Sequence, residues 1–313
     1  MAFPPAQGAR LSWEALPASV RTAIEQRLGS TVAAAVTRPG GFSPGVAARL
    51  ELEDGGYVFV KAIGPEPNPD SPEFHRREAR VAAALPPEAP APRLLFAHDE
   101  DGWVALAFEH IEGREPELPW REDELERVLA ALTDLADALT PPPLEAPPIS
   151  EALDELFHGW RTLASGDAAG IDPWAAGRLD ELAALEVGWA EGAAGSTLLH
   201  CDVRADNILL TPDRVVFVDW PHACVGAAWI DLVAFLPSVA MQGGPRPWEV
   251  FEAHPLGRDA PAEQVLPVVA GLAGFFVERS LQPPPPGLPT LREFQRAQGI
   301  EALAWVRRSL GGS

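Results

Sequence analysis

Three residues with oxygen-bearing side chains are close together in the sequence, on either side of a predicted turn in its C-terminal half. Asp202 stands five residues before Asn207, and Asp219 follows twelve residues after Asn207. The apolar runs 208–210 and 215–218 flank a Thr-Pro-Asp-Arg turn, so they predict a β-hairpin that brings Asn207 beside Asp219. An amide oxygen and a carboxylate are hard ligands that suit Mg²⁺. Asp202, on the loop that enters this hairpin, can orient a substrate hydroxyl and accept its proton.

A lysine and a glutamate in the first third are expected to form a buried ion pair. Lys61 ends a strand predicted over residues 57–62. Glu78 falls within the apolar stripe of a helix predicted over residues 71–85, a stripe formed by Phe74, Val81, Ala82 and Leu85. A buried carboxylate needs a cation, and Lys61 is the natural partner. The alternative is that Glu78 pairs with an arginine of its own helix: Arg76, Arg77 or Arg80.

A glycine-rich segment, residues 40–45, precedes the next predicted strand. Gly41, Phe42 and Ser43 stand at its centre. Glycine lets the backbone approach phosphate groups closely, which would suit a loop that covers a nucleotide. The segment does not match the GxGxxG pattern, so an ordinary turn is an equal alternative.

The predicted secondary structure differs between the first third of the chain and the remainder. The first third predicts a small α+β unit. Its strands are expected over residues 31–37, 46–53, 57–62, 93–97 and 103–108, and its helices over 17–28 and 71–85. The remainder is mostly helical, with helices expected over residues 122–139, 149–163, 174–189, 262–281 and 291–310. Residues 109–113 connect the two parts and are expected to form a hinge.

The HxDxxxxN string that begins at His200, followed by an apolar hairpin and Asp219, resembles the catalytic loop of the protein-kinase-like superfamily. From about residue 31 to residue 305 the chain resembles the aminoglycoside phosphotransferase family, less closely over residues 141–189. The resemblance implies an α+β, bilobal protein-kinase-like fold. A β-rich N-lobe with one embedded helix would cover residues 1–110, and a mostly helical C-lobe would cover residues 111–313. The implied activity moves the γ-phosphoryl group of ATP or GTP, with Mg²⁺, to a hydroxyl of a small molecule.

The same resemblance gives roles to the residues of the catalytic loop. Asp202 would be the catalytic base, and Asn207 and Asp219 would be the metal ligands. His200 would be a structural residue of the loop.

In the first third, the resemblance implies nucleotide-binding roles. Lys61 and Glu78 would position the α- and β-phosphates. The segment with Gly41, Phe42 and Ser43 would cover the nucleotide. Main-chain groups near Glu109 and Ile111, in the expected hinge, would bind the nucleobase edge.

Two residues depart from the pattern common in this family. Arg204 stands where histidine or lysine is frequent. Its guanidinium is expected either to stabilise charge on the transferred phosphoryl group or to pair with Asp206 or Glu191. Cys201 stands where glycine is frequent, and it is interpreted as a small buried thiol and not as a nucleophile.

Charge and composition restrict the partners. A formal net charge of -21 repels phosphate backbones, which excludes general nucleic-acid binding. The charge would attract a cationic acceptor such as an aminoglycoside-like antibiotic, although a solvated acidic surface is the simpler interpretation. Possible contacts for substrate ammonium groups are Glu151, Asp154, Glu155 and Asp172. No secretory signal or membrane-spanning segment is visible and only two cysteines occur, so a cytoplasmic enzyme is expected.

Other functions stay open at this level. The chain could be a non-catalytic nucleotide-binding pseudokinase that acts as an interaction module, or a kinase of a choline-like alcohol, a sugar, homoserine or a protein. Asp231, which resembles an aspartate that braces the catalytic loop, follows Asp219 by 12 residues. That short distance leaves little room for a peptide-docking segment and favours a small-molecule acceptor.

Overall fold

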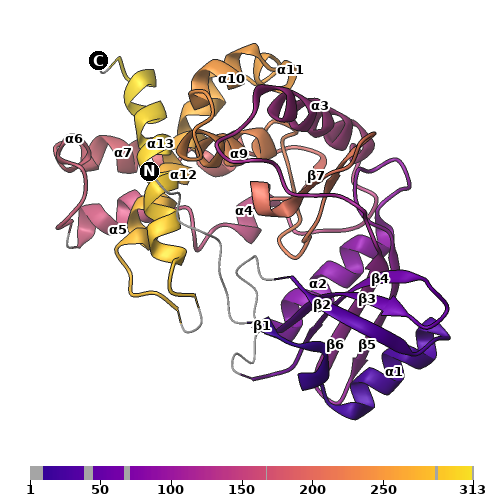
Figure 1. The fold of residues 1–313 in the computed structure, drawn as a ribbon. Coiled ribbons are helices and arrows are strands. Elements are labelled where there is room, and N and C mark those ends of the chain that lie inside the picture. The colour runs from indigo at the N-terminus through magenta and orange to yellow at the C-terminus, as the bar shows by residue number, and fades with distance from the viewer. Residues whose placement is uncertain (1–9, 39–44, 67–70, 167, 286–287, 312–313) are drawn as a thin grey trace.

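The structure is a computed structural model that describes residues 10–38, 45–66, 71–166, 168–285 and 288–311. A six-stranded sheet with its helices forms one end of the molecule, and a larger, mostly helical part forms the other (Figure 1). This is the mixed α+β arrangement expected from the sequence. No helix within the described ranges has both the length and the apolar character needed to cross a membrane.

The sheet follows the order β1-β3-β4-β6-β5, with β2 also paired to β3. Its neighbours are antiparallel except β1, which pairs in parallel with the start of β3. The strands are β1 Arg10–Leu11, β2 Val32–Thr37, β3 Gly45–Leu52, β4 Tyr57–Ile63, β5 Leu94–Glu100 and β6 Trp103–Glu109. The helices of this part are α1 Ala18–Leu28 and α2 Ser71–Ala84. The five strands expected from the sequence are present, and β1 is additional.

Helices α1 and α2 cover opposite faces of the sheet, because the strands alternate between two apolar clusters. On β4, Val60 and Ala62 pack in the cluster that contains Ile24 of α1. The intervening Lys61 therefore points to the other face, where α2 lies. The alternation of β4 thus decides that the lysine meets α2.

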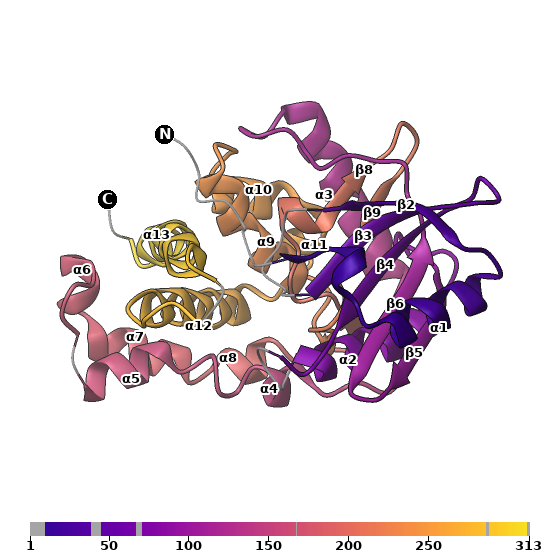
Figure 2. The ribbon, with the colours of Figure 1, turned by 60° about the horizontal axis from the view of Figure 1, so that its bottom comes forward.

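The rest of the described chain is mostly helical and packs around α12 and α9. The longer helices are α3 Glu122–Ala138, α9 Ile230–Met241, α12 Ala262–Ser280 and α13 Leu291–Ser309. The shorter ones are α4 Ile149–Ala152, α5 Gly159–Ser165, α6 Pro173–Ala176, α7 Leu179–Glu186, α8 Trp189–Gly192, α10 Pro247–Ala253 and α11 Pro255–Arg258. Helices α12 and α13 lie side by side, and α5, α7 and α8 pack along α12 (Figure 2).

Two of the predictions of a long helix are wrong. Residues 149–163 form α4 and α5 with a break between them, and residues 174–189 are divided among α6, α7 and α8. A Cβ at Gly159 would lie 2.1 Å from a carbonyl oxygen of α12, so this glycine permits a close approach of α5 to α12. Gly177 and Gly188 stand at the other two breaks, where their low helix propensity favours interruption.

A two-stranded antiparallel sheet and a hairpin frame the loop that contains Asp202. Strand β7 Thr197–Leu199 pairs with β10 Cys224–Gly226, and β8 Ile208–Leu210 pairs with β9 Val215–Phe217. The turn between β8 and β9 is the expected one, since the Thr211 N–H donates to the Arg214 carbonyl oxygen at 2.9 Å. The loop enters from β7 and leaves into β8, so both of its ends are fixed.

Candidate active site

The backbone of the loop that contains Asp202 is held by the first turn of α9. The carboxylate of Asp231 accepts hydrogen bonds from the main-chain N–H groups of His200 and Cys201, both at 2.8 Å. Cys201 has a φ of 62°, in the left-handed region that favours glycine. This conformation agrees with the expectation that glycine is frequent at this position, and the hydrogen bond to Asp231 helps to hold the Cys201 backbone in it.

His200 connects the loop to the end of β9. Its Nε2 lies 3.0 Å from the Val218 carbonyl oxygen, and the Asp202 N–H donates to its Nδ1 at 3.2 Å. Burial lowers the pKa of His200, so the ring is neutral and uses one nitrogen as donor and the other as acceptor. These are structural contacts that fix where Asp202 stands.

Asp202 lies between a guanidinium and an amide. Arg204 forms ion pairs with Asp202 and, at 2.9 Å, with Asp206. Asp206, and not Glu191, is thus the ion-pair partner among the two acids proposed from the sequence. The Asn207 amide nitrogen donates to the Asp202 carboxylate at 3.1 Å and to its carbonyl oxygen at 2.9 Å. Burial raises the pKa of Asp202, and the positive charge of Arg204 opposes that rise.

The expected pairing of Lys61 with Glu78 is confirmed. The Lys61 ammonium lies 2.6 Å from Glu78 Oε1 and 2.7 Å from Asp219 Oδ1. One lysine thus joins the sheet, α2 and the segment after β9. Lys61 is also the only lysine among 24 basic Lys and Arg residues of the chain. A chain that otherwise uses arginine has a compact ammonium at this one point, where two carboxylates converge.

The opposite charges of Lys61, Glu78 and Asp219 stabilise one another's ionised forms. Burial would lower the pKa of Lys61, but Asp219 and Glu78 raise it above its usual value. Burial would raise the pKa of Asp219, but Lys61 brings it well below the usual range. Burial raises the pKa of Glu78, and Lys61 opposes the rise. The ammonium and the Asp219 carboxylate are therefore charged at neutral pH.

The buried face of α2 differs from the expected apolar stripe at Phe74, and Leu85 follows the end of the helix. Glu78 is on the buried face with His75, Val81 and Ala82, whereas Phe74 is 38% exposed. The Phe74 ring instead lies 5.5 Å from the ring of His222. The prediction that Glu78 points inward is confirmed, and the prediction for Phe74 is wrong because the buried arc is centred on Glu78.

A cleft of about 390 Å³, here called the charged cleft, opens beside Lys61. Glu109 and Ile111, the residues of the expected hinge, both line it. Asn207 and Asp219 line it from the helical part of the molecule. Apolar side chains also line it: Val46, Phe59, Phe108, Ile111 and Leu209. A ligand with an apolar ring beside these side chains and anionic groups toward Lys61 would match this lining.

The donor set at the charged cleft fits a partial magnesium site. Asp219 contributes a carboxylate, and Asn207 contributes an amide oxygen, since its nitrogen is directed to Asp202. Among the described residues no group of three or more His, Cys, Asp or Glu side chains forms a complete metal site. Magnesium in phosphate chemistry commonly takes one or two protein ligands and fills its shell with water and phosphate oxygens.

The glycine-rich segment can be placed only at its end. Gly41, Phe42 and Ser43 lie outside the described residues. Gly45, which follows them and starts β3, has a φ of 102°, and a Cβ there would lie 2.6 Å from the Ala62 carbonyl oxygen. This position therefore requires glycine.

Four further groups of the charged cleft were not found by sequence reasoning. Arg10, Arg38, Arg114 and His75 also line it. Burial, with the nearby charge of Lys61, lowers the pKa of His75 to about 4, so its imidazole is neutral. The arginines stand in separate segments with no common motif. The parallel pairing of β1 with β3 brings Arg10 to the cleft, and nothing in its local sequence indicates that pairing.

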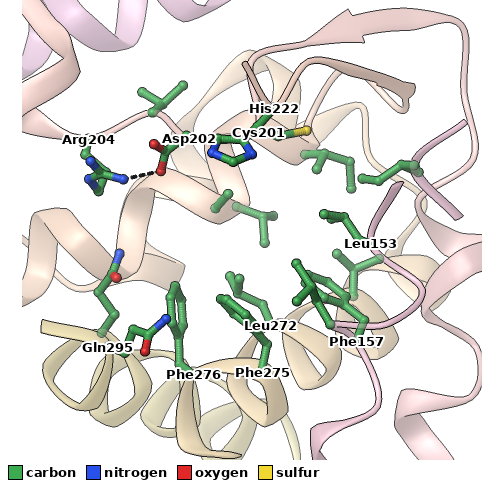
Figure 3. A pocket seen from close by; sticks show the side chains of 18 of the residues that line it. Leu153, Phe157, Cys201, Asp202, Arg204, His222, Leu272, Phe275, Phe276 and Gln295 are labelled. Carbon is green, nitrogen blue, oxygen red and sulfur yellow. Dashed lines mark hydrogen bonds and ion pairs between the residues drawn. The ribbon is translucent and has the colours of Figure 1, made fainter. Parts of the chain in front are cut away.

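A second cavity, of about 220 Å³, adjoins the loop that contains Asp202 and is called the apolar pocket (Figure 3). Asp202 and Arg204 lie at one end of it. Most of its wall comes from apolar side chains of α12, α13, α9 and the α4–α5 segment, with Leu153, Phe157, Leu272, Phe275 and Phe276 prominent. The acids suggested as substrate contacts do not line it: Glu151, Asp154, Glu155 and Asp172 are exposed. Asp172 instead caps α6.

The thiol of Cys201 also reaches the apolar pocket. Its Sγ lies 3.1 Å from Sγ of Cys224, and both cysteines are free. The hydrogen bond to Cys224 and burial raise the pKa of Cys201 well above its usual value. A thiol in that state is a poor nucleophile, which agrees with its interpretation as a packing residue.

Comparison with known proteins finds one matching family model and a group of similar solved structures. The model of the phosphotransferase enzyme family, APH, matches residues 36–266. A thermostable mutant of aminoglycoside phosphotransferase APH(4)-Ia, solved with ADP and hygromycin B, has a TM-score of 0.60 at 15% identity, over 92% of this chain and 98% of that one. Choline kinase LicA from Streptococcus pneumoniae has a TM-score of 0.60 at 14% identity, over 92% and 100%. Amicoumacin kinase hAmiN has a TM-score of 0.52 at 11% identity, over 86% and 88%.

The search of curated proteins finds no match. The structural likenesses, all at low identity, show a shared fold, and the kinase-like fold implied by the sequence resemblance is confirmed. The acceptors named for these relatives differ from one another, so the acceptor must be argued from the site itself.

Proposed function

The chain belongs to the phosphotransferase enzyme family, and from that membership we propose that it moves the γ-phosphoryl group of ATP or GTP to a hydroxyl of a small molecule. One observation carries the proposal. Residues 201–207 contribute to both cavities: Asp202 lines the apolar pocket, and Asn207, whose amide donates to the Asp202 carboxylate, lines the charged cleft. A donor and an acceptor bound in these two cavities would meet at the Asp202 carboxylate.

The residues of the charged cleft are suited to hold the donor. Main-chain groups near Glu109 and Ile111 would bind the nucleobase edge. Lys61, kept in place by Glu78, would bind phosphate oxygens. Asn207 and Asp219 would hold Mg²⁺, which when bound neutralises charge on the phosphates.

Asp202 would orient the acceptor hydroxyl and accept its proton as the oxygen attacks phosphorus. Arg204 pairs with Asp202 and so favours the ionised carboxylate that a base needs. Burial raises the pKa of Asp202, which makes it a stronger base than an exposed aspartate, and the charge of Arg204 opposes the rise. Arg204 would also be near charge that develops on the transferred group.

Two alternative functions have less support. A pseudokinase would be expected to lack part of the cluster of Lys61, Glu78, Asp202, Asn207 and Asp219, which is complete. A protein kinase needs a segment on which a peptide docks, but α9 begins at Ile230 and β10 occupies part of the short chain before it. A small acceptor in the apolar pocket agrees better with this geometry.

Nucleotide binding with and without metal tests the proposal. We expect ATP–Mg²⁺ or GTP–Mg²⁺ at 1 mM to raise the melting temperature by several degrees, because a ligand that binds only the folded state stabilises it. Asp219→Ala should abolish the magnesium-dependent part of the shift. Asp180→Ala, an exposed aspartate on α7, is the matched control and should behave as wild type. The absence of any shift with either nucleotide would contradict the kinase function.

A further inference from the structure

The walls of the apolar pocket restrict the chemistry of the acceptor. We propose that this pocket takes a largely apolar, uncharged alcohol and not a polycationic amino sugar. The inference rests on the proposed function, because it takes Asp202 as the group that meets the acceptor hydroxyl. Its evidence comes from the side chains that surround the rest of the molecule bound there.

Aromatic rings form the centre of the pocket wall. The ring of Phe275, on α12, lies 6.2 Å from Phe157 and 5.1 Å from Phe276. Phe157 in turn packs at 4.8 Å on Trp189, so the wall has a rigid backing. Phe275 is only half-buried and points into the open space of the pocket (Figure 3). A ligand that covered this ring would gain both apolar burial and aromatic contact.

The pocket has almost no negative charge to offer an ammonium group. Of the described residues that line it, Asp202 is the only one with a carboxylate. That carboxylate is already paired with Arg204, which adds a positive charge at the same end. The Arg204 guanidinium in turn lies 5.8 Å from the ring centre of Phe294. An acceptor with several ammonium groups would lose its water here and gain no carboxylate in exchange.

The other polar groups that α13 contributes are neutral. Gln295 and Gln298 stand one helical turn apart on α13, and both line the pocket while being largely buried. An amide donates and accepts hydrogen bonds without charge, so these groups suit a hydroxyl, ether or carbonyl of the acceptor. The acidic surface that gives the chain its net charge of -21 does not extend into the pocket.

A pair of alcohols that differ only in charge tests the inference. Choline has a quaternary ammonium, and 3,3-dimethyl-1-butanol has a carbon atom in its place. We expect kcat/KM with ATP–Mg²⁺ to be at least tenfold higher for the neutral alcohol. A larger neutral probe, 2-(2-naphthyl)ethanol, should be better still, and hygromycin B should be the poorest of the four. Binding of each probe is also measured by calorimetry, with and without a non-hydrolysable ATP analogue.

Phe275→Ala should raise KM for the naphthyl alcohol about tenfold and leave nucleotide binding unchanged, since the aromatic surface is lost on the acceptor side only. Phe96→Ala removes a half-buried phenylalanine of β5 outside both cavities and controls for a general loss of packing. Equal or better use of choline or hygromycin B would overturn the inference. So would a failure of the naphthyl alcohol to bind at 5 mM in a protein that binds ATP–Mg²⁺, an outcome that leaves the kinase function intact. Loss of the nucleotide shift itself would instead refute the proposed function.

Discussion

The two cavities that residues 201–207 help to line differ in the charged groups on their walls. The charged cleft has Lys61 between two carboxylates, and further cations line its edges. The apolar pocket has a single ion pair, Asp202 with Arg204, at one end. Both cavities are built partly by the same loop, so the contrast arises from the elements behind it: the sheet and α2 on one side, α12 and α13 on the other.

Under the proposed function, this difference in charge means that the donor and the acceptor would be recognised by different kinds of interaction. Phosphates carry charge that does not depend on the identity of the nucleotide, so a fixed set of cations and a metal can bind them in any enzyme of this kind. An acceptor recognised by apolar contact is selected by its shape and by the absence of charge. Under the proposed function, the charged cleft would therefore supply the fixed chemistry and the apolar pocket would supply the specificity.

The largest effect is expected where the charge of the cleft is most concentrated. Lys61→Met removes the cation between Glu78 and Asp219, and we expect kcat/KM to fall by about 10²–10³, the range found when one preorganised electrostatic group is lost. The side chain of Glu78 is only 3% exposed and would lose its counter-ion. Removing one partner of a buried pair costs about 3 kcal/mol or more, so thermal denaturation should show a melting temperature lower by several degrees.

Two further variants separate stability from catalysis at this site. The double variant Lys61→Met/Glu78→Leu has no unpaired carboxylate on α2, so it should recover most of the lost stability and none of the activity. Lys61→Arg keeps the charge but replaces a compact ammonium with a planar group, and we expect a fold near wild type with activity at least tenfold lower. Wild-type turnover by Lys61→Met would exclude Lys61 from the reaction.

A smaller effect is expected at the loop between the cavities. Arg204→Gln removes the charge that opposes the rise in the pKa of Asp202. Since a base must be deprotonated, activity is lost as pH falls through that pKa. The acidic limb of the kcat/KM profile should therefore move to higher pH, by about one unit for a close ion pair. At neutral pH the loss should be about tenfold, with partial recovery as pH rises.

Profiles between pH 5 and 9, measured with ATP–Mg²⁺, give the comparison. Arg80→Gln, on the exposed side of α2, is the control and should leave the profile unchanged. An acidic limb that stays in place, or moves to lower pH, would show that Asp202 is not the group that titrates.

The charged cleft could largely be predicted from the sequence because its key residues obey local rules. Strand alternation places Lys61, helical spacing turns Glu78 inward, and a short hairpin brings Asn207 beside the Asp219 segment. Each rule uses a few consecutive residues. The position of Arg10 was missed because it depends on a parallel pairing between β1 and β3, which leaves no periodic signal in two residues.

The apolar pocket could not be predicted in the same way. Its walls come from four separate regions, and their apolar side chains look like ordinary core residues in the sequence. The breaks before α5, α7 and α8 were also missed, since they depend on the close approach of Gly159 to α12 and on the low helix propensity of Gly177 and Gly188. The absence of carboxylates from the pocket becomes visible only when those regions are assembled.

The smallest effect is expected when a charge is added to the apolar pocket. Gln298→Glu places one carboxylate in the apolar pocket at nearly constant volume. We expect kcat/KM for 3,3-dimethyl-1-butanol to fall about threefold and that for choline to rise by a similar factor, since the desolvation of a buried carboxylate offsets much of its attraction for the ammonium. Gln26→Glu adds the same charge on the exposed side of α1 and should change neither value. If the choline preference does not change, the acceptor does not pass beside Gln298, and selection against charge depends on the aromatic wall alone.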